Sequence, residues 1–556
     1  MTSPHGATAP SGSRVLPPWA VALCAVALLA VMAAAMVTAA VRQSPTIDEP
    51  VYAAAALSYQ REHDLRLNPE HPPLGKLVIA AGVAFAHPRM DAGFAGTQED
   101  AGRRLLYGSG NDAQRVLLAA RLPVIVLTLL FGLVVFAFAS GLAGRTGGLV
   151  ALALYAFSPD VVAHGSLATL DVPAAGFLLT SAWLLWRARK RPLLWLPPAG
   201  AALGAAVATK MTMLAALPVL AALAAWSATR PSGPEPREGR RASRRALAVR
   251  GAGAAAGVLV VAVAVVWASY LAVDPRLRWT APPGVPDLGG ARGLAAGLMP
   301  FPRPFRDGMR IQFGFEGSTW TGFLFGRTYR GSLWYYLPAA LLVKTPLGAL
   351  ALWAAGIAAM AARRFRPAAP YVLLPPAVLL VAAMAGSRDL GVRYVIVVPM
   401  FLPVAAACAV ALPWRGAVRW RWAAAALLLF AVVSSLRTFP SYLPYSNEAF
   451  GGPSKTHLRL HDSNADWGQD LGRLADRLRA RYPREKVWLA YKGSGVPSYY
   501  GIDASDPFGA PPGQVRGLLV VSDSWIAKAD PRLIALLRTS EPIDDVGHTI
   551  TIYRRT

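Results

Sequence analysis

The feature that most constrains this chain is a series of apolar runs, each long enough to cross a membrane. They recur throughout residues 18–437, for example at residues 19–40, 116–139 and 251–272. A helix needs roughly 20 apolar residues to cross the hydrocarbon core of a bilayer. Only 16% of the residues are charged, whereas soluble proteins carry about 25%. The sequence therefore predicts a multi-pass membrane protein.

The excess of positive charge favours membrane orientation over binding of nucleic acid. The formal net charge is +25, yet residues 439–556 hold 15 Lys and Arg against 13 Asp and Glu. Most of the excess thus lies in short loops between apolar runs, and such loops stay in the cytoplasm. The basic loops are residues 187–191, 230–250, 363–366 and 415–421. No nucleic-acid partner is expected.

Placing these loops on one side of the membrane predicts about eleven transmembrane helices in residues 18–437. The predicted spans are residues 18–40, 116–140, 148–165, 172–186, 193–209, 211–228, 251–273, 337–361, 368–386, 394–412 and 422–437. Residues 1–17 become a cytoplasmic tail. Residues 74–86 are too short for a span and predict an interfacial or re-entrant helix on the outer surface. Residues 42–115 and 274–332 then form two large external loops.

Residues 438–556 predict a small extracytoplasmic α/β domain. Three segments rich in β-branched residues, at 486–491, 517–522 and 548–553, are typical of strands. Residues 470–480 carry apolar side chains at helical spacing. The expected fold class is therefore mainly α, a polytopic membrane protein with a C-terminal α/β domain.

Charged side chains gather at the predicted outer ends of the helices, which predicts a site there. They are Asp48, Glu49, His71, Asp171, Lys210 and Arg388. Asp48 or Thr46 could simply cap a helix that begins near Pro50. A carboxylate at the bilayer surface could also accept a proton from an acceptor hydroxyl. Both interpretations, a helix cap and a functional carboxylate, stay open for Asp48-Glu49. The same two interpretations apply to Asp171, which precedes Pro173.

Several cations lack an obvious partner in the sequence. Lys210 and Lys344 are each the only charge in a long apolar region, so they either snorkel to the interface or meet an anion such as a lipid phosphate. His71 and Lys76 lie in a proline-rich segment and are candidates for the same role. Glu70 beside His71 could bind a metal, although two ligands without a third are a weak signal.

At this point the motifs resemble a known family. They are the pair Asp48-Glu49, the run Glu-His-Pro-Pro-Leu-Gly-Lys at 70–76, the run Ala-Thr-Leu-Asp-Val-Pro at 168–173, and Thr209-Lys210. This set resembles glycosyltransferase family 39, which includes protein O-mannosyltransferases and aminoarabinose transferases and has the GT-C fold. The run at 462–471 is similar to one in bacterial carrier-lipid-dependent members.

The resemblance implies an enzyme of the bacterial plasma membrane that moves a sugar from a polyprenyl phosphate to an extracytoplasmic acceptor, with inversion. The acceptor would be a protein hydroxyl or an envelope glycolipid or glycan. By analogy Asp48 acts as the base, with Asp171 assisting and Glu49 in support. Lys210, Arg121 and Arg393 would hold the donor phosphate. Glu70 matches a metal ligand of one branch, so a divalent metal stays open and no other cofactor is expected.

Two other classes of protein use many helices with few charges. A transporter or lipid flippase would favour internal repeats and charges at the midplane, and neither is visible in the sequence. A non-catalytic scaffold would give no function to the acidic residues that are predicted at the outer surface. No Walker loop, Rossmann fingerprint or HExxH motif occurs, which argues against a nucleotide-driven pump or a metalloprotease.

Overall fold

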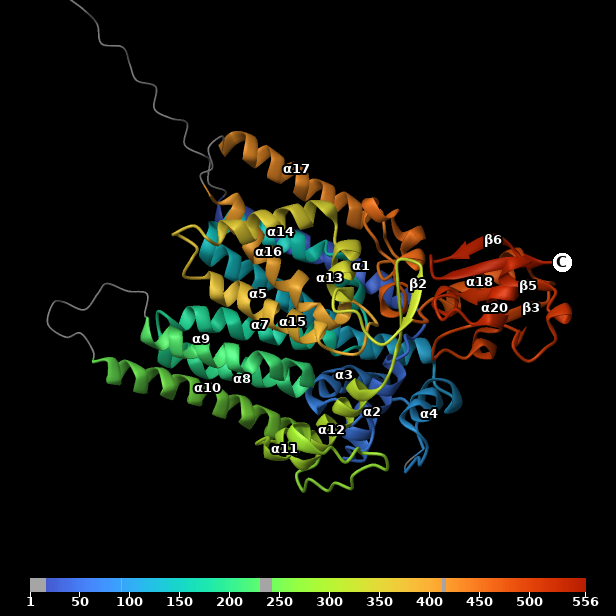
Figure 1. The fold of residues 1–556 in the computed structure, drawn as a ribbon, viewed down its shortest axis with the longest axis horizontal. Coiled ribbons are helices and arrows are strands. Elements are labelled where there is room, and N and C mark those ends of the chain that lie inside the picture. The colour runs from blue at the N-terminus through green and yellow to red at the C-terminus, as the bar shows by residue number, and fades with distance from the viewer. Residues whose placement is uncertain (1–16, 92, 231–242, 413–416) are drawn as a thin grey trace, which may run out of the picture.

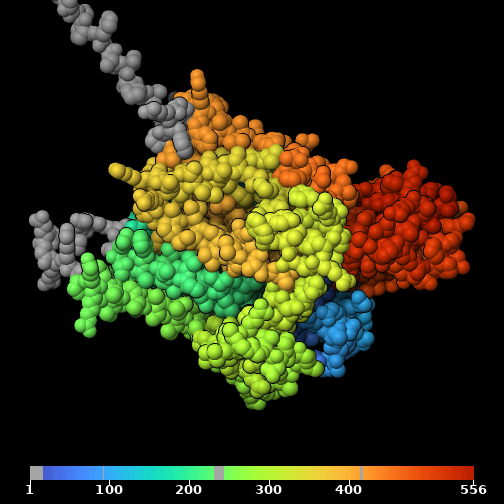
Figure 2. Space-filling view, viewed as in Figure 1, coloured from blue at the N-terminus to red at the C-terminus, as the bar shows by residue number. Residues whose placement is uncertain are grey.

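The computed structural model describes residues 17–91, 93–230, 243–412 and 417–556. The predicted tail at 1–17 and parts of the basic loops at 230–250 and 415–421 lie outside these ranges. A bundle of long helices carries a small sheet domain at one end (Figure 1). In the space-filling view this domain is a separate lobe (Figure 2). The predicted fold class is confirmed.

All eleven predicted apolar segments are helical. They correspond to α1 (Pro18–Arg42), the first half of α5 (Ala113–Ala156), the second half of α5 with α6 (Pro159–Gly165), α7 (Asp171–Ala188), α8 (Pro192–Thr209), η2 (Met211–Ala216) with α9 (Leu217–Thr229), α10 (Arg244–Val273), α13 (Tyr336–Lys344) with α14 (Leu347–Ala359), α15 (Ala369–Met384), η3 (Val392–Val395) with α16 (Val397–Val410), and α17 (Ala417–Leu436). Six helices within the described ranges are long and apolar enough to cross a membrane, or seven if α13 and α14 form one span. The protein is thus a multi-pass membrane protein.

Helix α5 is two helices joined at Gly144. This glycine has a φ of 77°, a left-handed conformation that glycine adopts without strain. The Tyr155 hydroxyl donates to the Thr128 carbonyl at 2.8 Å, so the two halves pack against each other as a hairpin. The hairpin explains how one continuous segment supplies two predicted spans.

The predicted single span at 337–361 is instead a bent pair. The chain bends by 119° between α13 and α14. The break falls at Thr345-Pro346, and Pro346 has no N–H to continue the helical ladder. The side chain of Lys344, the last residue of α13, is completely buried.

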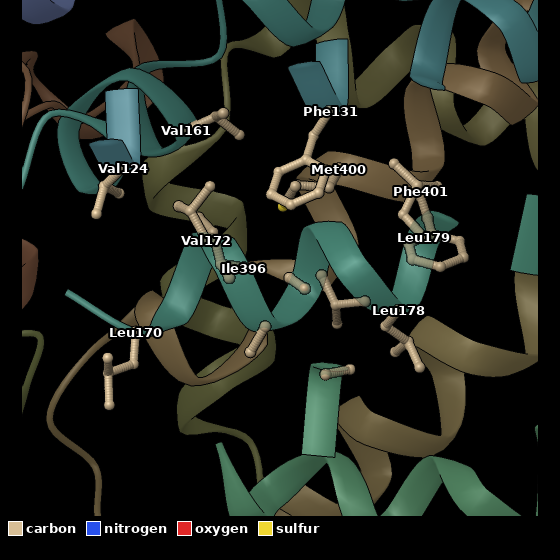
Figure 3. Packing of buried hydrophobic residues seen from close by; sticks show 14 of the residues in the cluster. Val124, Phe131, Val161, Leu170, Val172, Leu178, Leu179, Ile396, Met400 and Phe401 are labelled. Carbon is tan, nitrogen blue, oxygen red and sulfur yellow. The ribbon is translucent and has the colours of Figure 1, made fainter. Parts of the chain in front are cut away.

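Small residues and apolar side chains hold the bundle together. Gly200 and Gly204 on α8 lie against α10, where an added Cβ would meet the Val258 and Ala262 carbonyl oxygens at 2.8 and 2.6 Å. Such small-residue stripes let membrane helices approach closely. The centre is filled by side chains such as Phe131, where α5, α6, α7 and α16 meet (Figure 3).

The two predicted external loops contain structure of their own. The first holds α2 (Glu49–Arg61), α3 (Pro73–Ala86), α4 (Gln98–Arg103) and the π-helix η1 (Arg104–Gly108). The second holds α11 (Gly290–Leu298), α12 (Arg303–Gly317) and a hairpin of β1 (Thr321–Leu324) and β2 (Arg327–Arg330). Helix α3 coincides with the short apolar segment predicted at 74–86.

The C-terminal region has a five-stranded mixed sheet in the order β4-β3-β5-β7-β6. Its elements are η4 (Glu448–Phe450), η5 (Pro453–Leu458), η6 (Asp462–Asn464), α18 (Leu471–Arg481), β3 (Val487–Ala490), η7 (Pro497–Tyr500), β4 (Ala504–Ser505), η8 (Pro512–Gln514), β5 (Gly517–Ser522), α19 (Asp523–Ile526), α20 (Pro531–Arg538), β6 (Glu541–Val546) and β7 (Ile550–Arg555). Strands β3, β5 and β7 coincide with the three predicted strands. The sequence did not predict β4 and β6, which are a two-residue strand and a charged edge strand.

The described parts of the basic loops lie at the end of the bundle away from the sheet domain (Figure 1). Arg189, Arg230, Arg363 and Arg366 come from three different loops and line one surface cavity. This placement agrees with the prediction that these loops share one side of the membrane.

Candidate functional site

Asp48 stands at the N-cap position of α2, but its side chain makes no capping hydrogen bond. Its carboxylate instead pairs with Arg393, with 2.6 Å between Oδ2 and Nη1. The Asp48 side chain remains 25% exposed, while that of Arg393 is only 10% exposed. A simple cap therefore does not explain Asp48, which is left with an open, charged oxygen at the surface.

The neighbouring Glu49 is fully enclosed. It forms a two-pronged ion pair with Arg121, with both N–O distances at 2.7 Å. It also accepts hydrogen bonds from the N–H and hydroxyl of Thr46 and from the N–H of Ala168. Burial raises the pKa of Glu49, but the Arg121 charge and these hydrogen bonds outweigh it and hold the pKa below its ordinary value. Glu49 thus joins three segments through its carboxylate.

Arg121 uses all five of its N–H groups inside the protein. Besides Glu49, it donates to the carbonyl oxygens of Ala40, Gln43 and Ser44 at 2.6–3.0 Å. No N–H remains for a donor phosphate. This geometry favours a structural role, in which Arg121 fixes the chain where α1 enters the first external loop.

Asp171 and Lys210 form a second ion pair. Asp171 begins α7 and Lys210 follows the last residue of α8, so a short hydrogen bond between the side chains connects the two helices. Both side chains are more than nine-tenths buried. Because Lys210 has this one hydrogen-bond partner among the described residues, its remaining N–H groups can serve a ligand.

Three cations surround the ring of Tyr394. Lys210, Arg393 and Arg388 lie 5.1, 5.2 and 5.8 Å from its centre. Arg388 has its own carboxylate partner, Glu316, at 2.8 Å. Three ion pairs from five elements therefore converge on one aromatic ring, and attraction between cations and aromatic rings supports this arrangement. We call Lys210, Arg388 and Arg393 the cation cluster.

A cavity of about 550 Å³ opens beside the cation cluster. Arg388, its partner Glu316 and Tyr394 line it together with Arg292, while Met, Leu, Ala and Phe side chains from η2, α12 and α15 line most of the rest. A charged end and an apolar wall suit a ligand with a polar head and a hydrocarbon chain.

Residues 462–470 close the site from the C-terminal side. The Trp467 ring is buried, and the Arg393 guanidinium lies 4.3 Å from its centre. The backbone N–H of Ile47 donates to the Trp467 carbonyl at 3.1 Å, and that of Ser44 donates to the Gln469 carbonyl at 2.9 Å. One segment therefore supports both Arg393 and the chain that leads to Asp48.

Asn464 joins the same segment to the membrane helices. Its side-chain oxygen accepts from the Val392 N–H, and its carbonyl accepts from the Lys344 ammonium at 2.8 Å. An added Cβ on Gly391 would lie 2.1 Å from the Ser463 hydroxyl oxygen, so only glycine permits this contact. Lys344 also bonds to the Leu443 carbonyl and lies 3.5 Å from Asp160. It is enclosed by protein partners.

Lys76 lies inside the protein, whereas His71 is partly exposed. Lys76 is completely buried and donates to the backbone carbonyls of Asn68 and His71 and to the Asn68 side chain. Burial and the charges of Lys210 and Lys76 lower the pKa of His71 well below its ordinary value. His71 is therefore a neutral ring, packed edge-on against Tyr52 at 6.0 Å.

Glu70 is held by two amide groups. One of its oxygens accepts from the Asn68 side chain at 2.8 Å and from the Gln98 side chain at 3.0 Å. Over the described ranges, no three His, Cys, Asp or Glu side chains are grouped so that they could hold a metal. Metal binding by Glu70 stays a prediction, and no step proposed below depends on a metal.

The sequence did not single out Tyr394 or Trp467, and it did not commit Arg388 to a role. The signal was available, because Arg388 and Tyr394 belong to one polar run at a helix end and Trp467 lies in the motif at 462–471. The sequence did not reveal that these two motifs meet Asp48, which lies more than 340 residues earlier in the chain.

Comparisons with known proteins agree with this architecture. Residues 25–244 match the family model described as dolichyl-phosphate-mannose-protein mannosyltransferase. The structure of ArnT from Cupriavidus metallidurans in the apo state is similar, with a TM-score of 0.50 at 16% identity, over 96% of this chain and 98% of that one. No curated protein sequence matches this chain.

Two further solved structures are similar at lower TM-scores. ArnT from Cupriavidus metallidurans bound to undecaprenyl phosphate gives 0.49 at 15% identity, over 97% of this chain and 98% of that one. The oligosaccharyltransferase AglB from Archaeoglobus fulgidus, in complex with an inhibitory peptide and a dolichol-phosphate, gives 0.43 at 14% identity, over 84% of this chain and 59% of that one. The family match thus covers residues 25–244, and the fold is shared with ArnT along nearly the whole chain.

Proposed function

We propose that this protein transfers a sugar from a polyprenyl phosphate to an acceptor hydroxyl on the extracytoplasmic side of the membrane. The observation that carries the proposal is the convergence of three ion pairs on Tyr394 beside a cavity with one charged end. The description of the family model that matches residues 25–244, dolichyl-phosphate-mannose-protein mannosyltransferase, supports the same chemistry.

The cation cluster is the proposed site for the donor phosphate. Lys210 and Arg388 would neutralise the phosphate, and the apolar wall of the cavity would take the first part of the hydrocarbon chain. Neutralisation matters because the phosphate leaves with the electron pair of the broken sugar–oxygen bond. Fixed cations stabilise this developing charge without reorganising at the moment of reaction.

Asp48 is the proposed base. Its open carboxylate would take the proton of the acceptor hydroxyl as the acceptor oxygen bonds to the anomeric carbon. The bond between that carbon and the phosphate oxygen breaks on the opposite face, so the configuration is inverted. Arg393 holds Asp48 in place and Asp171 holds Lys210. The acceptor would be a protein hydroxyl or an envelope glycan.

The test is transfer by purified protein in vesicles that contain a synthetic polyprenyl-phosphate hexose. Asp48→Asn should reduce transfer at least 1000-fold, because the amide cannot accept the proton. The control is Asp91→Asn in the same loop, where Asp91 forms an exposed pair with Arg104. This control should transfer at the normal rate. Normal turnover by Asp48→Asn would remove Asp48 as the base, and absence of any transfer by the wild type would contradict the proposal itself.

A further inference from the structure

A second cavity lies away from the cation cluster, between the membrane helices and the C-terminal domain. Its volume is about 820 Å³. The end of α1, the beginning of α5 and one face of α18 line it. We call it the arginine groove.

The groove is named after five arginine side chains in its lining. Arg473, Arg477 and Arg481 are spaced four residues apart on α18 and therefore lie on one face of the helix. Arg42, the last residue of α1, and Arg479 complete the set. Like charges on one helix face destabilise it unless anions lie nearby.

Three carboxylates face these five arginines, and one of them, Asp476, lines the groove and pairs with Arg479 at 2.7 Å. Arg477 and Arg481 share a single oxygen of Asp544 at 3.6 and 3.5 Å. Within the ranges that the structure describes, the Arg42 side chain makes no ion pair. Arg473 pairs with Asp470, yet its Nη2 atom is buried and has no hydrogen-bond partner among the described residues. The groove is thus short of negative charge and has an unused donor.

The groove lies at the edge of the apolar layer. Helix α1 changes there from apolar residues to Arg42, and α5 becomes apolar shortly after Gln114, which also lines the groove. Val41 brings an apolar side chain to the same wall. Cations at this height face the headgroups of the bilayer. Arginine suits phosphate because its planar guanidinium can donate two parallel hydrogen bonds.

We propose that the arginine groove binds the phosphate of an anionic membrane phospholipid and thereby holds the C-terminal domain against the bilayer. The phosphate would meet Arg477 and Arg481, with Arg42 on the opposite wall. The acyl chains would follow the apolar surface of α1. This inference does not depend on the proposed transferase activity.

The test is native mass spectrometry of the full chain in a neutral detergent, with equal amounts of phosphatidylglycerol and phosphatidylcholine added. The wild type should retain phosphatidylglycerol at least tenfold more than phosphatidylcholine. The double variant Arg477→Gln/Arg481→Gln should lose this preference. The matched control Arg516→Gln/Arg538→Gln removes two exposed arginines elsewhere on the same domain and should keep it. If the groove variant does not fold, Arg42→Gln at the helix end provides the same comparison.

Two results would overturn the inference. One is equal retention of both lipids by the wild type, or an unchanged preference in the groove variants. The other is complete displacement of phosphatidylglycerol by about 10 mM inorganic phosphate, a concentration at which even a weakly bound free anion occupies its site. Such displacement would show a site for small anions and not for a lipid.

Discussion

Asp48 and Glu49 are adjacent in the sequence but occupy opposite environments. Glu49 receives five hydrogen bonds and has no exposed surface. Asp48 has one cationic partner and stays partly open. The first carboxylate is suited to holding the chain in place, and the second is suited to exchanging a proton with a ligand. The acidic pair therefore divides into a structural residue and a candidate base.

This division predicts different defects for the two residues. Glu49→Gln should lower the free energy of unfolding by about 3–5 kcal/mol, because Arg121 would remain buried without its anion. The measurement is the thermal midpoint of the full chain in detergent, compared with Asp48→Asn, which should stay close to the wild type. A Glu49→Gln protein that is as stable as the wild type but slow in transfer would instead make Glu49 part of the catalytic machinery.

At the level of elements, the segment at 462–470 connects the C-terminal domain with the site. It provides the Trp467 ring for Arg393 and backbone acceptors for the chain at 44–47. Through Asn464 it also accepts hydrogen bonds from the backbone N–H of Val392 and from the ammonium group of Lys344. The domain is therefore part of the site and not a module attached to it by a flexible tether.

We expect Trp467 to position Arg393, and through it Asp48. Trp467→Leu should lower kcat by about 10–100-fold with little change in the KM for the donor, because a one-ångström displacement of a reacting group can cost that much. Trp467→Phe should restore most of kcat, since it retains an aromatic face for the guanidinium. Steady-state kinetics with both variants tests this. Equal loss in both variants would indicate a purely structural role.

The same domain holds two buried carboxyl groups whose ionisation at higher pH lowers the stability of the folded state. Burial raises the pKa of Asp466 and of Asp523 to about 7, above the ordinary carboxyl value of about 4. The folded state therefore holds these protons more tightly than the unfolded state. Their stabilising effect is complete below about pH 4 and is lost as the pH rises to about 7.

Asp523→Asn cannot ionise and should make stability less dependent on pH between about 5 and 7. The hydroxyl of Thr551 donates to Asp523 at 2.9 Å, and the amide oxygen can accept the same bond. The thermal midpoint at several pH values is the measurement. Asp503→Asn, at an exposed position, is the control. A decline as steep as that of the wild type would show that Asp523 ionises freely in the folded protein.

At the scale of the whole molecule, the two ends of the bundle differ in charge, and this difference bears on how the protein is oriented in the membrane. The described parts of the basic loops lie at one end and the sheet domain lies at the other (Figure 1). Arg393 of the cation cluster contacts Trp467 of the C-terminal region. Because positively charged loops stay in the cytoplasm, we expect the proposed site to face outward. Asymmetry of this kind is expected for an enzyme that receives its donor at the outer membrane surface.

Single cysteines can check this orientation in intact cells, once Cys24 and Cys408 have been replaced by serine. Arg364→Cys lies in a basic loop and Arg538→Cys in the sheet domain, both at exposed positions. We expect an impermeant thiol reagent to label only Arg538→Cys, and both after the membrane is permeabilised. Labelling of Arg364→Cys in intact cells would reverse the assigned orientation.

The sequence alone determined which segments are helices, since an apolar run of membrane length has to satisfy its own backbone hydrogen bonds. It also placed β3, β5 and β7, whose β-branched residues suit a buried sheet, but not the charged edge strand β6. It brought Asp48, Asp171 and Lys210 to one face through loop charge. Only the tertiary structure decided which cation meets which anion. Such pairs join residues up to 345 positions apart, and their choice depends on helix packing, which local sequence does not encode.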